Sequence, residues 1–284
     1  MIRTTLLLGA LTGLIMGIGQ WLGGPHGLLI AFAFALLMNF GSYWFSDKIV
    51  LAAYGARQVS EAEAPMLSRM VHNLSLQAGL PMPKLYIMPS DAANAFATGR
   101  NPEHAAVAVT EGILRLMNER ELTGVLAHEL AHVKNRDILI SSIAATLAGA
   151  IMMIADMARW TAIFGGMSRD EEHDGSGVGV LGLIVMSVVA PLAAMIIQMA
   201  ISRTREYAAD ATGARTSGDP LGLALALEKL GAAAERIPLD ASPQTSHLFI
   251  VKPFSGRSLL QLFSTHPPLQ DRIARLRAMA GQRP

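Results

Sequence analysis

The sequence predicts a mainly α-helical, α+β membrane protein, in which pairs of transmembrane helices alternate with two soluble segments that carry a small β-sheet. Hydrophobic residues make up 51% of the chain and charged residues only 16%, which is too apolar for an ordinary soluble domain. The excess of apolar residues is gathered in four long segments. The stretches between these segments have the periodicity of amphipathic helices and short strands.

Residues 1–45 are expected to form a helical hairpin that spans the membrane at 4–22 and again at 27–45. Both stretches are long and uncharged, and the loop Gly-Gly-Pro-His between them is too short for anything but an antiparallel pair of helices. Because a cleaved signal peptide would not be followed directly by a second span, we interpret the first span as a retained anchor.

The first soluble segment, 46–137, is expected to begin with a helix over 61–78 that ends at Gly79. Three short strands are predicted next, at 84–88, 93–98 and 105–110. A helix over 111–117 and a longer helix within 121–137 complete the segment.

Residues 138–201 contain the second pair of apolar segments, at 138–159 and 178–201. Asp156 lies near the end of the first segment and Pro191 lies inside the second. We predict two further membrane spans here, and the alternative is a buried hairpin of a soluble protein.

The second soluble segment, 202–284, is expected to open with a helix that carries Glu206 and Asp210. Asp219 followed by Pro220 is typical of a helix start, and predicts a helix that runs to about Glu235. The last predicted helix has an apolar face formed by Leu269, Ile273 and Leu276.

The charges predict the orientation in the membrane. The loop between the third and fourth spans is net acidic over 169–174, whereas most Lys and Arg residues follow the second and fourth spans. By the positive-inside rule, both termini and both soluble segments face the cytoplasm. A net charge of +1, without a basic cluster interleaved with aromatic residues, argues against a nucleic-acid partner. The chain has no cysteine, so the fold cannot depend on disulfides.

The stretch His128-Glu-Leu-Ala-His132 indicates a metal site. Residues four apart lie on one face of a helix, so both histidines can offer a ring nitrogen to one ion, while Glu129 can reach a water on that ion. The alternative is a pair of ordinary core histidines on an amphipathic helix. An apolar surface would not tolerate Glu129 unpaired, however, and this favours one Zn²⁺ per chain.

A zinc site of this kind needs a third protein ligand. Glu206 and Asp210 are again four apart, so one helix can aim the first carboxylate at the metal and the second at the free ring nitrogen of a ligating histidine. The alternative is a solvated charged turn in which Arg203 and Arg205 pair with the two acids.

With these motifs the chain resembles the HtpX-type membrane zinc metalloproteases, gluzincins related to the CAAX prenyl proteases. The resemblance is carried by Asn94-Ala-Phe-Ala-Thr-Gly99, Leu126-Ala-His-Glu-Leu-Ala-His132, Asn135-Arg-Asp137, Ser202-Arg-Thr-Arg-Glu-Tyr-Ala-Ala-Asp210 and Thr265-His-Pro-Pro268. It implies a gluzincin-like protease domain with His128, His132 and Glu206 as zinc ligands. It also implies an endopeptidase of the bacterial cytoplasmic (inner) membrane that acts in protein quality control and the stress response on unfolded or membrane-protein substrates.

Each of the remaining site residues has an expected role in peptide hydrolysis. Glu129 would take a proton from the metal-activated water and return it to the leaving amine. For the developing oxyanion the resemblance suggests His266, with Arg205 as the second choice and a purely local role as the alternative for His266. An edge strand for an extended substrate is predicted at Asn94, Ala95, Phe96, Ala97 and Thr98.

The chain positions of the ligands predict cleavage at the membrane surface. His132 lies six residues before the third span and Glu206 five residues after the fourth. At ~1.5 Å per helical residue, the metal would lie within roughly 10 Å of the hydrocarbon edge. No feature of the sequence predicts an oligomeric state.

Two other functions remain open from the sequence. A CAAX-type prenyl-protein peptidase uses the same zinc chemistry, although its chamber is normally built from more than four spans. A non-enzymatic membrane scaffold with a structural zinc is the other alternative, although structural sites usually close the fourth position with a protein ligand and have no use for Glu129.

Overall fold

The computed structural model describes residues 2–144, 203–236, 250 and 267–281, which belong to two compact units. The described part of one unit is residues 2–40, and the other unit contains the remaining described residues. The predicted spans at 138–159 and 178–201 lie outside the described residues, apart from 138–144, which are helical.

Helix α1 (Ile2–Ala53) contains both N-terminal apolar segments. Its helical backbone is interrupted at Gly23 and Gly24, and Gly24 has a φ of 56°, a left-handed conformation that glycine adopts without a Cβ clash. Within the described part of the chain, one helix, Gly23–Ala53, is long and apolar enough to cross a membrane by its length and composition. The helix before the kink, Leu8–Trp21, is also apolar but shorter.

The two parts of α1 within residues 2–40 pack against each other as a hairpin. The amide of Asn39 donates a hydrogen bond of 2.8 Å to the hydroxyl of Thr12, which lies far from it in the sequence. Close to the kink, a Cβ at Gly27 would overlap the carbonyl oxygen of Gly19, so this approach requires glycine.

The other unit contains a four-stranded sheet with the order β1-β2-β4-β3. The strands are β1 (Arg57–Val59), β2 (Lys84–Met88), β3 (Ala95–Gly99) and β4 (Ala105–Thr110). The central pair β2–β4 is parallel, and the two outer pairs are antiparallel. The sequence predicts β2, β3 and β4 but not β1, which has only three residues and is held by its pairing with β2.

Besides the helical residues 138–144 and the end of α1, this unit contains six further α-helices and one 3₁₀ turn among the described residues. They are α2 (Pro65–Ala78), η1 (Pro102–His104), α3 (Glu111–Leu116), α4 (Glu119–Lys134), α7 (Arg203–Ser217), α8 (Pro220–Arg236) and α9 (Leu269–Gly281). Helix α4 begins with a capping box, in which Asn118 and Glu121 each bond the backbone N–H of the other. The predicted helix over 61–78 begins only at Pro65, and it ends as expected with Gly79 in the left-handed conformation.

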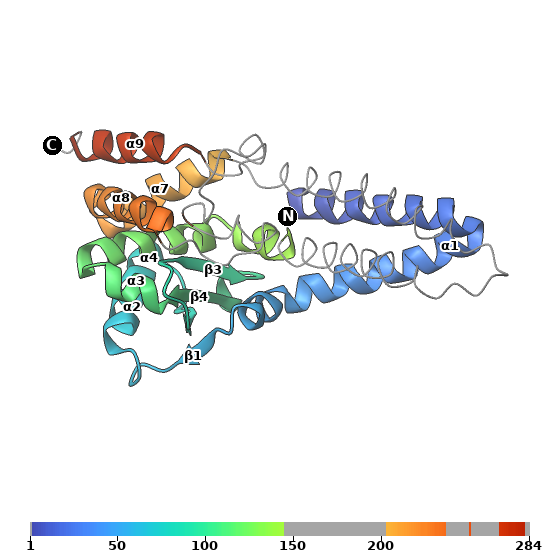
Figure 1. The fold of residues 1–284 in the computed structure, drawn as a ribbon, viewed down its shortest axis with the longest axis horizontal. Helices are drawn as coiled ribbons and strands as arrows, with labels where there is room; N and C mark the ends of the chain where they lie inside the picture. The colour runs from blue at the N-terminus through green and yellow to red at the C-terminus, as the bar shows by residue number, and fades with distance from the viewer. Residues whose placement is uncertain (1, 145–202, 237–249, 251–266, 282–284) are drawn as a thin grey trace. The chain divides into compact units, whose positions relative to one another are not determined.

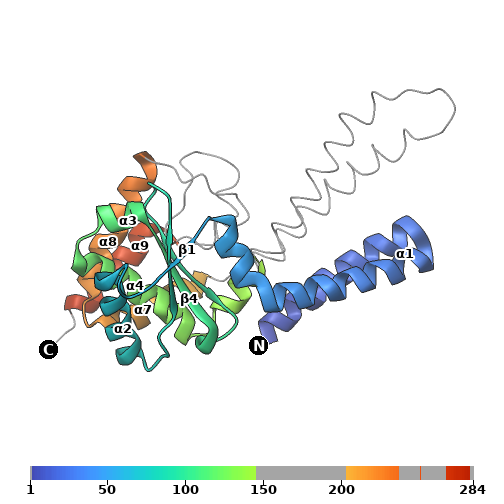
Figure 2. The same ribbon diagram turned by 90° about the horizontal axis from the view of Figure 1, so that it is seen from below.

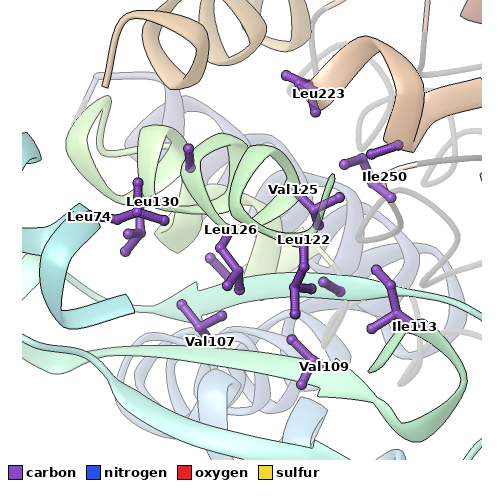
Figure 3. Packing of buried hydrophobic residues seen from close by; sticks show 14 of the residues in the cluster. Leu74, Val107, Val109, Ile113, Leu122, Val125, Leu126, Leu130, Leu223 and Ile250 are labelled. Carbon is purple, nitrogen blue, oxygen red and sulfur yellow. The ribbon is translucent and has the colours of Figure 1, made fainter. Parts of the chain in front are cut away.

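Helix α4 lies between the sheet and helices α7 and α8, and α9 packs on α8 (Figure 1). Figure 2 shows α2, α4 and α7 on the same side of the sheet. The core between these layers contains residues of α2, β4, α4 and α8 (Figure 3): Leu74, Val107, Val109, Leu122, Val125, Leu126, Leu130 and Leu223. The opposite face of the sheet is covered by the end of α1, where Val50 and Leu51 pack against Phe96. Because α4 is enclosed on both sides, polar side chains on it are held in a buried environment.

Candidate metal centre

Helix α4 places three polar side chains in the interior of the unit. His128 and Glu129 are only 1% and 4% exposed, and His132 is partly buried. The motif spacing puts both histidines on one face of the helix, with their ring centroids 4.7 Å apart. The apolar residues that fix this helix in the core therefore also fix the orientation of the motif.

Helix α7 brings a second set of polar side chains against this face. Glu206, Asp210 and Gly213 follow one another at helical spacing along the side of α7 that meets α4. A Cβ at Gly213 would lie 2.8 Å from the backbone nitrogen of His128, so only glycine allows the two helices to approach this closely.

The side chains of His128, His132 and Glu206 converge on one point. The Nε2 atoms of the two histidines are 3.2 Å apart, and the Glu206 oxygens lie 3.8 Å from Nε2 of His128 and 3.7 Å from Nε2 of His132. A tetrahedral zinc ion with bonds of about 2.1 Å requires ligand atoms about 3.4 Å apart, so these separations suit one ion. Two imidazoles and a carboxylate are also a ligand set of catalytic zinc. The three residues therefore fit a bound metal ion.

The outer ring nitrogens of both histidines face carboxylates. Nδ1 of His128 lies 2.9 Å from Oδ1 of Asp210, and Nδ1 of His132 lies 3.5 Å from Oδ2 of Asp137. A carboxylate beside Nδ1 favours the tautomer with the proton on Nδ1, which leaves the lone pair of Nε2 for a metal. The predicted placement of Asp210 next to a histidine ring agrees with this geometry, whereas Asp137 had no predicted role.

A buried arginine from α9 joins this cluster. Arg272 is 1% exposed and donates two hydrogen bonds to Asp210, from Nε at 2.8 Å and from Nη2 at 2.7 Å. Its Nη1 donates to the carbonyl oxygen of Ile250 at 2.8 Å and lies 3.6 Å from Oε2 of Glu206. The acids of α7 thus have a cationic partner on α9, which the sequence did not suggest.

Burial and neighbouring charges shift the pKa values in the cluster. Burial raises the pKa of Glu129 to about 7, although His132 acts in the opposite direction. Burial alone would lower the pKa of His132, but the hydrogen bond to Asp137 and the charges of Glu206 and Glu129 raise it to about 9. Burial lowers the pKa of His128. Burial would raise the pKa of Asp210, but Arg272 holds it well below its usual range. A zinc ion would compete with the proton on His132 for the same nitrogen.

Strand β3 lies next to Glu129, at the edge of the sheet. The backbone N–H of Ala97 donates a hydrogen bond of 2.9 Å to Oε2 of Glu129. Among the described strands β3 pairs with β4 alone, and the backbone N–H of Ala97 points away from β4. Because backbone groups alternate in direction along a strand, the N–H and C=O groups of Ala95 and Gly99 also point toward the open edge. The predicted substrate strand is therefore an edge strand in the structure, and its open side faces Glu129.

The other residues of the predicted substrate strand lie on either side of this contact. Phe96 and Thr98 are buried, and Thr98 shares a hydrogen bond of 2.6 Å with Ser142. Asn94 precedes the strand and is 3% exposed, and its side-chain nitrogen has no hydrogen-bond partner among the described residues.

Of the two residues proposed to stabilise the oxyanion, the structure describes Arg205 but not His266. Nη1 of Arg205 lies 3.6 Å from Oδ1 of Asp137, which in turn faces His132. Arg205 therefore belongs to the surroundings of the cluster. His266 lies outside the described residues, and its role stays a prediction.

Three residues of the cluster were missed by sequence reasoning. Asp137 lies in the Asn135-Arg-Asp137 motif, but its position after the helix does not reveal which ring nitrogen it faces. Arg272 lies on the apolar face of the last helix, between Leu269 and Leu276. A charged residue on an apolar face could have indicated a buried ion pair. Gly213 had no signal of its own, because its role depends on the approach of another helix.

A buried carboxylate held between a His-His-Glu cluster and the open edge of a β-strand is the arrangement of a metallopeptidase. Comparison with known proteins agrees, since residues 61–280 match the family model described as Peptidase family M48. The chain belongs to this family.

The chain is similar over nearly its whole length to proteins named Protease HtpX homolog. It is 63% identical to the one from Desulforapulum autotrophicum, with 97% of this chain and 89% of that protein covered. It is 62% identical to the one from Syntrophobacter fumaroxidans, with 98% of each chain covered. It is 56% identical to the one from Pyrococcus furiosus, with 98% of this chain and 96% of that protein covered. The HtpX-type resemblance suggested by the motifs is thereby confirmed.

The fold is also found in the crystal structure of S. mikatae Ste24p, with a TM-score of 0.53 and 18% sequence identity. The comparison covers 97% of this chain and 65% of that chain. Together, the family, the relatives and the apolar helix of α1 support a membrane metalloprotease with a mainly helical fold and a small sheet.

Proposed function

We propose that the protein is a membrane-bound zinc endopeptidase that cleaves misfolded or damaged membrane proteins at the cytoplasmic face of the bacterial cytoplasmic membrane. The observation that carries the proposal is the buried cluster of His128, His132 and Glu206, whose ligand atoms all lie within 4.8 Å of one another. Glu129 stands beside this cluster and is not needed as a ligand, which leaves its carboxylate for proton transfer.

A zinc ion held by these three residues would supply Lewis-acid chemistry, polarising a peptide carbonyl and making a water proton more acidic. Glu129 would act as the general base and acid, accepting a proton from the attacking water and later donating it to the amine of the leaving peptide. The N–H of Ala97 donates to Oε2 of Glu129, and the remaining lone pairs of the carboxylate, including both on Oε1, would be available for the proton. The same hydrogen bond fixes the carboxylate in position, which favours transfer in both directions.

The edge of β3 supports an extended polypeptide as the substrate. A segment that pairs with the backbone groups of Ala95 and Gly99 would lie along the strand that bonds Glu129 through Ala97. Main-chain pairing tolerates many sequences, but a tightly folded protein cannot offer a free strand. The site would therefore select unfolded or membrane-proximal segments.

The apolar segments support a location at the membrane. Helix α1 exposes large apolar side chains along its length, among them Trp21, Leu29, Ile30 and Phe40. The further spans proposed at 138–159 and 178–201 separate the two metal-binding helices in the sequence. A multi-pass topology with both termini and the zinc residues on the cytoplasmic side follows from the positive-inside rule.

The proposal is tested by comparing the wild type with Glu129→Gln and Glu206→Ala in detergent or proteoliposomes. We expect stoichiometric zinc in the wild type and in Glu129→Gln, and loss of at least about 10²-fold in the cleavage of unfolded casein or an unfolded membrane protein by Glu129→Gln. Glu206→Ala should lose both zinc and activity. Stoichiometric zinc in Glu206→Ala would refute its role as the third ligand.

Two control outcomes separate the alternatives. Zinc binding without any peptide cleavage by the wild type would indicate a non-enzymatic scaffold. Efficient cleavage of a farnesylated peptide, with no cleavage of unfolded proteins, would instead indicate a CAAX-type prenyl-protein peptidase. Equal cleavage of a tightly folded soluble protein and of its unfolded form would contradict the proposed selection of unfolded segments.

A further inference from the structure

We propose that Arg272 is a positioning residue for the metal, and that the docking of α9 through this arginine completes the zinc site. The inference rests on the proposed zinc function. It assigns to α9 a part in metal binding, although α9 contains no metal ligand.

The contacts of Arg272 link α9 to both acids of α7. One edge of the guanidinium, formed by Nε and Nη2, donates two hydrogen bonds to Asp210, and Nη1 lies 3.6 Å from Oε2 of Glu206. A guanidinium that bonds both oxygens of a carboxylate fixes the plane of that carboxylate. Oδ1 of Asp210, which accepts from Nη2 at 2.7 Å, is also the atom that lies 2.9 Å from Nδ1 of His128. Arg272 therefore orients the histidine ring through Asp210.

The position of Arg272 on its helix argues for a purpose beyond packing. Leu269, Arg272, Ile273 and Leu276 share one face of α9, and the last three of these are buried. A leucine or methionine at position 272 would continue this face without the cost of burying a charge, which is considerable even for a paired arginine. What an apolar residue cannot supply is a cation within reach of Asp210 and Glu206.

The charges explain why the cation is needed. Glu129, Glu206 and Asp210 are all buried within one cluster, and all are negative when ionised. Arg272 is a permanently charged partner that lies 2.7 Å from Oδ1 of Asp210 and 3.6 Å from Oε2 of Glu206. Without Arg272, the two carboxylates would repel each other, and part of the free energy of zinc binding would be used to hold Asp210 and Glu206 in position. The zinc affinity would therefore be lower.

The test measures zinc affinity by competition with a chelator on the full-length protein. We expect Arg272→Gln to bind zinc about 10–100-fold more weakly than the wild type, as is typical when the partner of a ligating side chain is lost. Arg272→Lys keeps the charge but not the two-point bond, so its affinity should lie between those of the wild type and Arg272→Gln. The matched control is Arg277→Gln, since Arg277 lies on the same helix and pairs with Glu228 at 2.6 Å outside the cluster. This variant should bind zinc like the wild type.

A double variant separates positioning from general stability. If Arg272 acts through Asp210, the combination of Arg272→Gln with Asp210→Asn should bind zinc within about threefold of the weaker single variant, whereas independent effects would multiply. The double variant should also be more stable than Arg272→Gln alone, because Asp210 is then no longer a buried charge without its partner. The spectrum of the cobalt-substituted Arg272→Gln protein should differ from that of the wild type, a change that a purely structural arginine would not produce.

The outcomes that overturn the inference are distinct from those that overturn the proposed function. If the wild type binds zinc and Arg272→Gln binds it equally tightly, only the role of Arg272 is refuted. Multiplicative effects in the double variant would refute its action through Asp210. If Arg272→Gln does not fold, Arg272→Lys replaces it in both measurements, and wild-type zinc affinity in Arg272→Lys, or multiplicative loss when it is combined with Asp210→Asn, overturns the inference. Absence of zinc binding in the wild type refutes the proposed function itself.

Discussion

Replacement of Gly213 by alanine should separate the two helices that carry the metal-binding residues. Gly213 lies on the side of α7 that meets α4, one turn beyond Asp210. An added Cβ would be 2.8 Å from the backbone nitrogen of His128 and 2.9 Å from the carbonyl carbon of Ala127. These neighbours are backbone atoms of a buried helix, so they cannot rotate away as the end of a flexible side chain could.

The size of the effect follows from these distances. Ordinary contact begins at 3.4 Å, so α7 must move away from α4 by about 0.6 Å or more. The same displacement at Asp210 would lengthen its 2.9 Å contact with His128 to about 3.5 Å, beyond a good hydrogen bond. Overpacking of this kind costs about 1–3 kcal/mol, and the higher helix propensity of alanine offsets up to about 1 kcal/mol. We therefore expect a net loss of about 1–2 kcal/mol in the free energy of unfolding, together with about tenfold weaker zinc binding.

Thermal unfolding in detergent and chelator competition measure the two effects. The control is Gly281→Ala, since no other part of the described structure lies within 4 Å of the added Cβ at this position of α9. The control should keep the stability and zinc affinity of the wild type. A Gly213→Ala protein with unchanged unfolding midpoint and unchanged zinc affinity would show that the close approach of α4 and α7 does not determine the geometry of the site.

Two further predictions concern protons in the cluster. Asp210→Asn should weaken zinc binding by about 10–100-fold and lower activity without abolishing it at saturating zinc, because it disturbs the orientation of His128 but removes no ligand. A zinc affinity equal to that of the wild type in a chelator titration would refute the role of Asp210 in orienting His128. The second prediction concerns pH, because the pKa of His132 is raised to about 9 in the folded protein. Protonation of His132 therefore stabilises the fold of the metal-stripped protein below about pH 6.5, and this stabilisation is lost as the pH rises through about 9. Because zinc must displace this proton, its apparent affinity should rise about tenfold per pH unit between about pH 7 and 9 and then level off. A flat profile over this range, measured by chelator competition, would contradict the raised pKa.

The spacing of residues along the chain was sufficient for the parts of the site that lie on single helices. His128, Glu129 and His132 share one helix face because four residues are close to one helical turn, and the same rule aligned Glu206 with Asp210. Strands β2 and β4 have the predicted bounds, since short apolar runs between turn residues are also local signals. The end of α2 at Gly79 and the start of α8 at Pro220 were also predictable, because glycine after a helix and proline at its first position are local signals.

What depended on tertiary structure were the contacts between elements that lie far apart in the sequence. Arg272 meets Asp210 across 62 residues of chain, and Ala97 meets Glu129 across 32, and no local pattern encodes such pairs. The three-residue strand β1 exists through its pairing with β2, and Gly213 has a function only because α4 packs against it. The physical reason is that periodicity reports which face of an element is buried, but not which partner covers that face. The sequence by itself therefore determined the donor atoms proposed for the metal, and the packing of α4, α7 and α9 decided which charges surround them.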